Sequence, residues 1–140
     1  MSKKIYLDTN IYIDYFEGRV DNLRPLGEFA YELLRKTFSC EFFIVISTLV
    51  LKELTYNGYE EQIKILIEEL KKKEKIQCIE LTREDKEYGL SLIKNRKTPH
   101  NDTFHVVLAQ KAKAEYVVTR NLKDFIEMFD LIEIALPENL

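Results

Sequence analysis

Runs of consecutive apolar residues alternate along this chain with longer segments in which apolar residues recur every three or four positions. Short apolar runs are typical of buried strands, and the longer spacing predicts amphipathic helices. The expected strands cover residues 5–7, 42–46, 76–81, 116–119 and 131–134. The expected helices cover residues 11–16, 22–36, 48–56, 59–75, 82–95, 102–114 and 121–128. Because strands alternate with helices, we predict an α/β fold with a mainly parallel sheet of about five strands and right-handed crossovers.

Individual residues mark several of the expected helix ends. Gly18 should end the first helix, and Ser47 should cap the helix that follows the second strand. Thr82 and Asp85 have the spacing of a capping box. Residues 98–101, Thr-Pro-His-Asn, predict a break before the next helix. The pattern therefore predicts element boundaries as well as element types.

Length and composition indicate one domain that spans residues 1–140. With 46% hydrophobic residues, the chain has enough apolar surface for a core, and it contains no linker, repeat or low-complexity segment. No stretch approaches the ~20 apolar residues of a membrane-spanning helix, and the chain start has no signal-peptide features. We therefore expect a cytoplasmic protein that does not contact a membrane. Cys40 and Cys78 form no Cys-x-x-Cys pair, and we expect core thiols rather than disulfide or metal sites.

The formal net charge of −3 argues against a protein that coats nucleic acid through bulk electrostatics. It does not exclude a nuclease, because metal ions in an acidic site reverse the local charge. Local clusters of charge therefore matter more than the total.

The first expected strand stops abruptly on an acidic residue, Asp8. Thr9 or Asn10 can support this position by accepting hydrogen bonds from the first free N–H groups of the following helix. In an open α/β sheet, ligands collect where the carboxyl ends of strands face the amino ends of helices. Burying a lone carboxylate costs several kcal/mol, so Asp8 must be solvated, capped or bound to a cation.

Three further acidic residues lie near strand ends or in first helical turns: Glu53, Asp102 and Asp124. Each has an ordinary structural explanation, because a charge in a first turn gains ~0.3–1 kcal/mol from the helix dipole and exposed glutamates are common. Together with Asp8, however, they could converge on one crevice, where they would repel each other unless cations lay between them. Oxygen-only ligation suits Mg²⁺ or Mn²⁺, which would activate water at a phosphodiester without a histidine base.

Four segments carry a resemblance to a known family. They are residues 6–10 (Tyr-Leu-Asp-Thr-Asn), 50–54 (Val-Leu-Lys-Glu-Leu), 101–105 (Asn-Asp-Thr-Phe-His) and 118–125 (Val-Thr-Arg-Asn-Leu-Lys-Asp-Phe). In order and spacing, over nearly the whole chain, they resemble the PIN-domain nucleases, in particular the VapC-like toxins of bacteria and archaea. The resemblance implies a three-layer α/β/α fold and a Mg²⁺- or Mn²⁺-dependent endoribonuclease that cleaves single-stranded or structured RNA.

The same resemblance implies roles for particular residues. The implied catalytic and metal-binding acids are Asp8, Glu53, Asp102 and Asp124. It places Thr119 and Asn121 beside this site, and Thr9 behind the first aspartate. Related sequences differ in whether the last acid directly follows the Thr-x step or stands three residues later, and here Asn121 takes the nearer place. The resemblance further implies a homodimer and a cognate antitoxin that covers the site.

A basic cluster directly precedes the third acid. It consists of Lys94, Arg96, Lys97 and His100. We expect this cluster to form a rim that holds the phosphates of an RNA strand. His105 lies about one helical turn beyond Asp102. We expect it on the helix surface or at the rim of the site rather than as a metal ligand or general acid, because hard ions need no imidazole.

The residues leave other functions open. The same metal chemistry would serve a DNA- or flap-directed PIN nuclease, since no residue that reads a 2′-hydroxyl can be named. A small-molecule phosphatase would use Asp8 as its nucleophile, but the acid expected two residues later is Asn10. A non-catalytic PIN scaffold domain would keep the fold with an idle site, and the complete acidic set argues against it.

Overall fold

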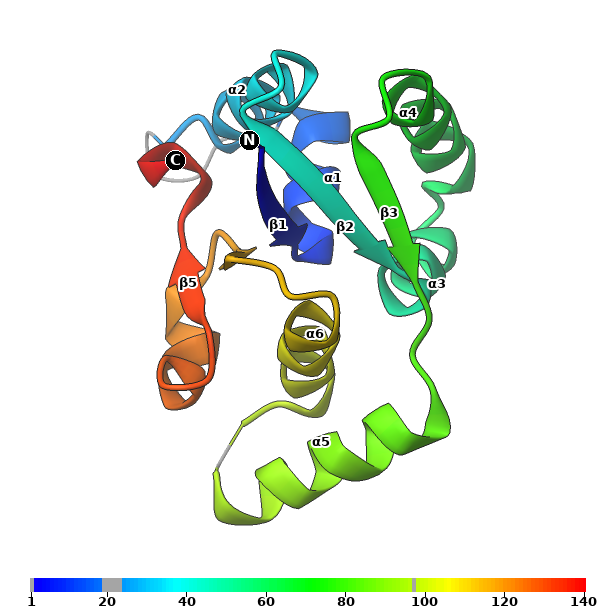
Figure 1. Cartoon of the computed structure of the whole chain (residues 1–140). Coiled ribbons are helices and arrows are strands. Elements are labelled where there is room, and N and C mark those ends of the chain that lie inside the picture. The colour runs from blue at the N-terminus through cyan, green and yellow to red at the C-terminus, as the bar shows by residue number, and fades with distance from the viewer. Residues whose placement is uncertain (1, 19–23, 97) are drawn as a thin grey trace.

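A computed structural model describes residues 2–18, 24–96 and 98–140, which form a five-stranded, entirely parallel sheet with helices on both faces (Figure 1). The strands are β1 (Lys3–Leu7), β2 (Phe42–Ser47), β3 (Ile76–Ile79), β4 (Tyr116–Val118) and β5 (Glu133–Ala135). The helices are α1 (Thr9–Glu17), α2 (Leu26–Phe38), α3 (Thr48–Tyr56), α4 (Glu60–Lys72), α5 (Arg83–Asn95) and α6 (His100–Lys111). Two 3₁₀ helices are η1 (Leu122–Met128) and η2 (Pro137–Asn139). The predicted three-layer α/β/α fold is confirmed.

The two faces of the sheet carry different helices. α1, α2 and α4 lie on one face of the sheet, and α5 and α6 lie on the other, as Figure 1 shows. α1 packs on α2, α5 packs on α6, and η1 packs against α6. The parts of a strand that are covered on both faces are mostly apolar, which explains the apolar runs in the sequence, such as residues 5–7 of β1.

β1 is the central strand of the order β3-β2-β1-β4-β5. The chain adds β2 and β3 on one side of β1 and then adds β4 and β5 on the other side. Leu7 pairs with Val118 of β4, and the backbone N–H of Asp8 donates to the Val118 carbonyl at 2.9 Å. The first residues beyond these two strands, Asp8 and Thr119, therefore lie next to each other. In an open parallel sheet this change of side leaves a crevice at the carboxyl ends of the strands, where ligands bind.

The core is built from the central strands and the inner faces of the helices. Ile5, Tyr6 and Leu7 are all fully buried, as are Ile44 and Ile46 of β2. Tyr6 is the one member of this set with a polar tip, and a buried hydroxyl needs a hydrogen-bond partner. Its partners belong to the candidate site.

The predicted helix signals hold in the structure. Gly18 ends α1 with a left-handed φ of 61°, a conformation that glycine adopts without steric cost. The Ser47 hydroxyl accepts the Val50 N–H at 3.1 Å. Thr82 and Asp85 form a reciprocal capping box at the start of α5. Each contact satisfies backbone groups that a helix end leaves free.

Several predicted boundaries differ from the structure. α6 begins at His100 rather than Asp102, because the Pro99 carbonyl already accepts the Thr103 N–H at 3.1 Å and closes the first turn. The expected start of the second helix, Asn22, lies outside the described residues, and α2 is described from Leu26. The last expected helix is a 3₁₀ helix, and the last strand is displaced by two residues at its start.

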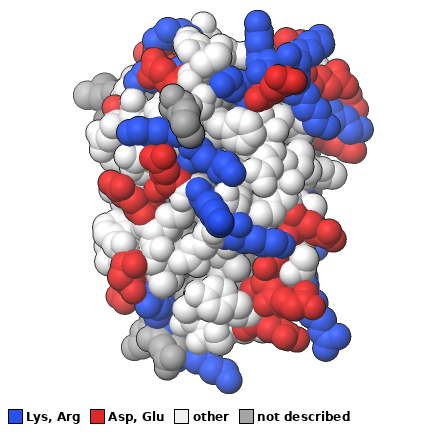
Figure 2. All heavy atoms as spheres, viewed as in Figure 1, with Lys and Arg blue, Asp and Glu red and all other residues white. Residues whose placement is uncertain are grey.

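Cys40 and Cys78 are exposed free thiols, so the prediction that they are core residues is wrong. Cys78 lies on β3, an edge strand of the sheet, and Cys40 lies in a turn with a φ of 70°. Figure 2 shows both basic and acidic side chains over the described part of one face. Within the described ranges, no helix is long and apolar enough to cross a bilayer.

Candidate active site

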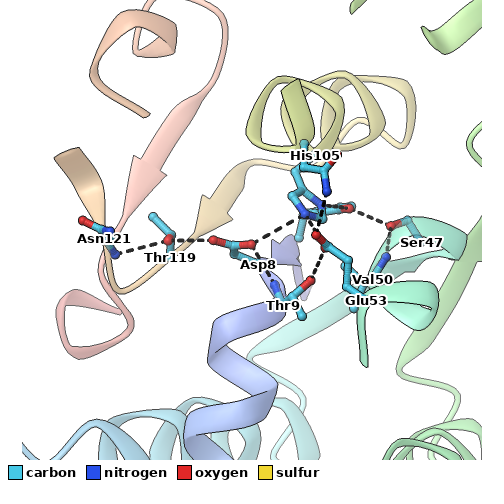
Figure 3. Close-up of polar contacts among 10 residues, drawn as sticks. Asp8, Thr9, Ser47, Val50, Glu53, His105, Thr119 and Asn121 are labelled. Carbon is cyan, nitrogen blue, oxygen red and sulfur yellow. Dashed lines mark hydrogen bonds and ion pairs between the residues drawn. The ribbon is translucent and has the colours of Figure 1, made fainter. Parts of the chain in front are cut away.

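Asp8 is the first residue after β1, next to the end of β4, and is itself the N-cap of α1. Its Oδ1 accepts the Thr9 N–H at 2.8 Å, and its Oδ2 accepts the Thr119 hydroxyl at 2.9 Å (Figure 3). The prediction that Thr9 or Asn10 caps this helix is therefore wrong, since Asp8 comes first in the chain and reaches the free N–H. Asn10 instead has a buried side-chain oxygen for which no hydrogen-bond partner is found among the described residues.

Glu53, on α3, accepts three hydrogen bonds from side chains of other elements. The Thr9 hydroxyl and His105 Nε2 lie 2.6 and 2.9 Å from Oε1, and Asn101 Nδ2 lies 3.0 Å from Oε2. Burial raises the pKa of this carboxyl, but the bonds from His105, Thr9 and Asn101 outweigh burial and leave the pKa below its ordinary value. Glu53 is therefore held as an anion in a fixed orientation.

Asp102 lies half-buried in the first turn of α6 and is the most perturbed acid of the site. Burial and the charge of Asp8 raise the pKa of Asp102 to about 7. His105 opposes this rise, and the charges of Asp124 and Glu53 add to it. No hydrogen bond to its carboxylate is found among the described residues. A half-buried carboxylate beside other acids and without a donor is a group that a cation would stabilise.

Asp124, on η1, extends the acidic set at the far side of β4. Its Oδ2 accepts the Asn121 side-chain amide at 2.7 Å, and the Asn121 backbone N–H donates to the Thr119 hydroxyl oxygen at 3.2 Å. Thr119 thus links Asn121 to Asp8, as Figure 3 shows. Thr119 therefore lies beside Asp8, and Asn121 lies beside Asp124.

His105 is fully buried, so the prediction that it lies on the helix surface or at the rim is wrong. Its Nδ1 lies 2.7 Å from the Tyr6 hydroxyl, which lies 2.7 Å from the Ser47 hydroxyl. Burial lowers the pKa of His105, but the bond to Glu53 and the charges of Asp8, Glu53 and Asp102 raise it above its ordinary value. The polar tip of Tyr6 within the buried residues 5–7 is a sequence signal that a polar partner lies in the core, although it does not identify His105.

The predicted basic rim is only partly available to a ligand. Arg96 donates to both carboxylate oxygens of Asp130, at 2.6 and 2.8 Å, and to the Glu127 carbonyl at 2.6 Å. Lys94, near the end of α5, and His100, at the start of α6, are both exposed. Lys97 lies outside the described residues. Arg96 therefore fastens the end of α5 to the segment after η1.

The donor chemistry of the site fits a hard divalent ion, although the described part of the chain contains no group of three ready-placed metal ligands. The candidate ligands are carboxylates, which suit Mg²⁺ or Mn²⁺. Protein donors already occupy oxygens of Asp8 and Glu53, whereas the Asp102 carboxylate carries none among these residues. Among these acids, Asp102 therefore has the carboxylate that is most available to bind an ion.

Comparison with known proteins shows which family and which solved structures the chain is similar to. The family model for the PIN domain matches residues 5–128. A toxin-antitoxin complex from Klebsiella pneumoniae is similar in structure with a TM-score of 0.64 and 21% identity, over 95% of this chain and 97% of that one. VapBC2 from Rickettsia felis, bound to a promoter DNA fragment, gives a TM-score of 0.64 and 22% identity, over 94% and 96%. No match was found among the curated proteins.

The family match covers most of the chain, including Asp8, Glu53, Asp102 and Asp124. The chain belongs to the PIN domain family. PIN domains are generally nucleases, and the resemblance of the sequence to this family is thereby confirmed.

Proposed function

We propose that this protein is a Mg²⁺- or Mn²⁺-dependent endoribonuclease of the VapC type, the toxin of a toxin-antitoxin pair in the cytoplasm. The observation that carries the proposal is the half-buried Asp102 carboxylate, which faces Asp8, Glu53 and Asp124 without a hydrogen-bond donor among the described residues. Membership of the PIN family and likeness to two toxin-antitoxin complexes support it.

The four carboxylates would bind the ion, and neighbouring side chains would keep these carboxylates in position. When bound, a divalent ion supplies an activated water and neutralises charge on the phosphodiester. Thr119 orients Asp8, and Thr9 and His105 orient Glu53, through the hydrogen bonds described above. In other metal enzymes, the loss of such a supporting contact typically lowers metal affinity or activity by about 10–100-fold.

A protein partner is part of the proposal, because both similar structures are complexes of a toxin with its antitoxin. An apolar groove of about 410 Å³ between α1, α2 and α4, which none of the four acids lines, offers the antitoxin a second contact besides the acidic site that it is expected to cover. Phe16, Phe38 and Ile65 line this groove, and Ile65 is 63% exposed. Exposed apolar surface of this kind often marks a protein interface. We also propose a homodimer, in keeping with the sequence resemblance.

End-labelled substrates test the proposed reaction. Single-stranded RNA should be cleaved with Mg²⁺ or Mn²⁺ and not with chelator, leaving 5′-phosphate and 3′-hydroxyl ends because water attacks rather than the 2′-hydroxyl. Asp102→Asn should be inactive. Cleavage that persists in chelator, or cyclic-phosphate ends, would contradict the mechanism. Cleavage of a matched DNA strand instead of RNA would indicate a DNA-directed nuclease. The absence of both cleavage and metal binding would indicate a scaffold domain.

A further inference from the structure

Two adjoining hollows form one groove that starts at Glu53 and runs between α3 and the α5–α6 pair. The hollow next to the acids measures about 420 Å³, and the outer one about 250 Å³. Leu49, Lys52 and Asn101 line both, so the two are continuous. Asn101 also donates to Glu53 at 3.0 Å, which ties the wall of the groove to the acidic site.

The outer part of this α3–α5 groove carries positive charge without a matching negative charge. Lys52 and Lys86 line it, and no acidic residue does. Both side chains are exposed, and neither forms an ion pair within the described part of the chain. Neighbouring basic residues behave differently, since Arg83 pairs with Glu87 and Lys111 pairs with Asp85.

Aromatic rings lie at both ends of the groove. Tyr56, which lines the hollow next to Glu53, is 90% exposed. Phe104 lines the outer hollow, and its ring packs so closely on Gly89 of α5 that an added Cβ would lie 2.7 Å from it. Gly89 therefore allows α5 to approach α6 and keeps Phe104 in the wall of the groove. A largely exposed tyrosine ring beside a cleavage site offers a flat surface on which a base can stack.

We propose that a single-stranded segment of the nucleic acid substrate lies in this α3–α5 groove. Lys52 and Lys86 bind its phosphates, and Tyr56 stacks on a base next to the cleaved bond. The inference rests on the proposed nuclease function and adds the path of the substrate. It differs from the basic rim predicted from sequence, whose Arg96 is held by Asp130. Lysines for phosphates with an aromatic platform for bases are the usual elements of single-strand binding.

Binding of a fluorescein-labelled single-stranded RNA, measured by anisotropy over a series of KCl concentrations, tests this path. The measurement uses the Asp102→Asn background so that the probe stays intact. Changing Lys52 and Lys86 together to Ala should reduce the slope of log affinity against log salt by about 1.4, since each phosphate contact on a single strand contributes about 0.7. Changing both to Arg should keep the slope. Tyr56→Ala should weaken binding about tenfold at every salt concentration, and Tyr56→Phe should not.

Two controls locate the effect. Lys72→Ala with Lys73→Ala removes equal charge from the end of α4, outside both hollows, and should leave the slope unchanged. Lys94→Ala with Arg96→Ala tests the basic rim, and a change of slope there but not for Lys52 and Lys86 would overturn the groove while leaving the nuclease proposal intact. If the unmodified protein neither binds nor cleaves RNA or DNA, the proposed function fails and the groove assignment fails with it.

Discussion

His105 Nε2 lies 2.9 Å from Glu53 Oε1, and this contact joins the acidic site to the buried core. Since a carboxylate only accepts hydrogen bonds, Nε2 carries the proton, and a neutral ring accepts at Nδ1 from the Tyr6 hydroxyl. The Tyr6 oxygen can in turn accept from Ser47. The result is a continuous set of hydrogen bonds from β2 through β1 and α6 to Glu53, which fixes the ring and the carboxylate together.

Replacing His105 should therefore weaken metal binding through Glu53. His105→Leu removes the donor to Glu53 and the acceptor of Tyr6, and we expect Mn²⁺ affinity to fall by roughly 10–100-fold. His105→Gln, which can still donate to Glu53, should recover part of the loss. Isothermal titration with Mn²⁺ checks this. Equal affinities for the Leu and Gln variants would show that the ring only fills space.

Two buried tyrosines provide a matched pair for stability. Tyr6→Phe leaves His105 and Ser47 short of a partner, and it should lower the free energy of unfolding by about 1–3 kcal/mol. Tyr12 is equally buried, but its hydroxyl has no hydrogen-bond partner among the described residues. Tyr12→Phe should therefore be neutral or slightly stabilising. Urea denaturation of the two variants measures the difference, and equal losses would contradict the role assigned to Tyr6.

The metal-free protein should lose stability as the pH rises towards neutrality. The Asp102 carboxyl has a pKa of about 7 in the folded chain and an ordinary value of 3.8, so folding takes up a proton between these values. The contribution of this proton uptake to the free energy of unfolding is complete below about pH 4 and is lost as the pH rises through 7. The raised pKa of His105 acts in the same direction at higher pH.

Thermal melts in chelator between pH 5 and pH 8 follow this loss. We expect the melting temperature of the parent to fall by several degrees across the range, at roughly 2–4 °C per kcal/mol for a domain of this size. Asp102→Asn cannot titrate at this position, and its curve should be flatter. Parallel curves for the two proteins would contradict the raised pKa of Asp102.

The sequence was informative where local rules decide the structure. The apolar runs predict the strands, and the acidic residue at the end of the first run predicts that Asp8 lies where β1 ends and α1 begins. Sequence could not predict His105 as a partner of Glu53, because their contact joins positions 52 residues apart on two helices. The pairing of Arg96 with Asp130 is similarly non-local. The sequence predicts that Tyr6 lies in a buried strand, but the partners of its hydroxyl, Ser47 and His105, are distant in the chain and come together only in the folded protein.

A melting series with Mn²⁺ tests most directly whether the four acids form a metal site. The parent should gain about 1.4 kcal/mol when the free ion is at ten times its dissociation constant. Asp102→Asn should gain clearly less, yet in chelator it should be at least as stable as the parent, because one repelling charge is gone. If Asp102 were only a helix-start charge, the Asn variant would melt lower in chelator and keep the full response to Mn²⁺.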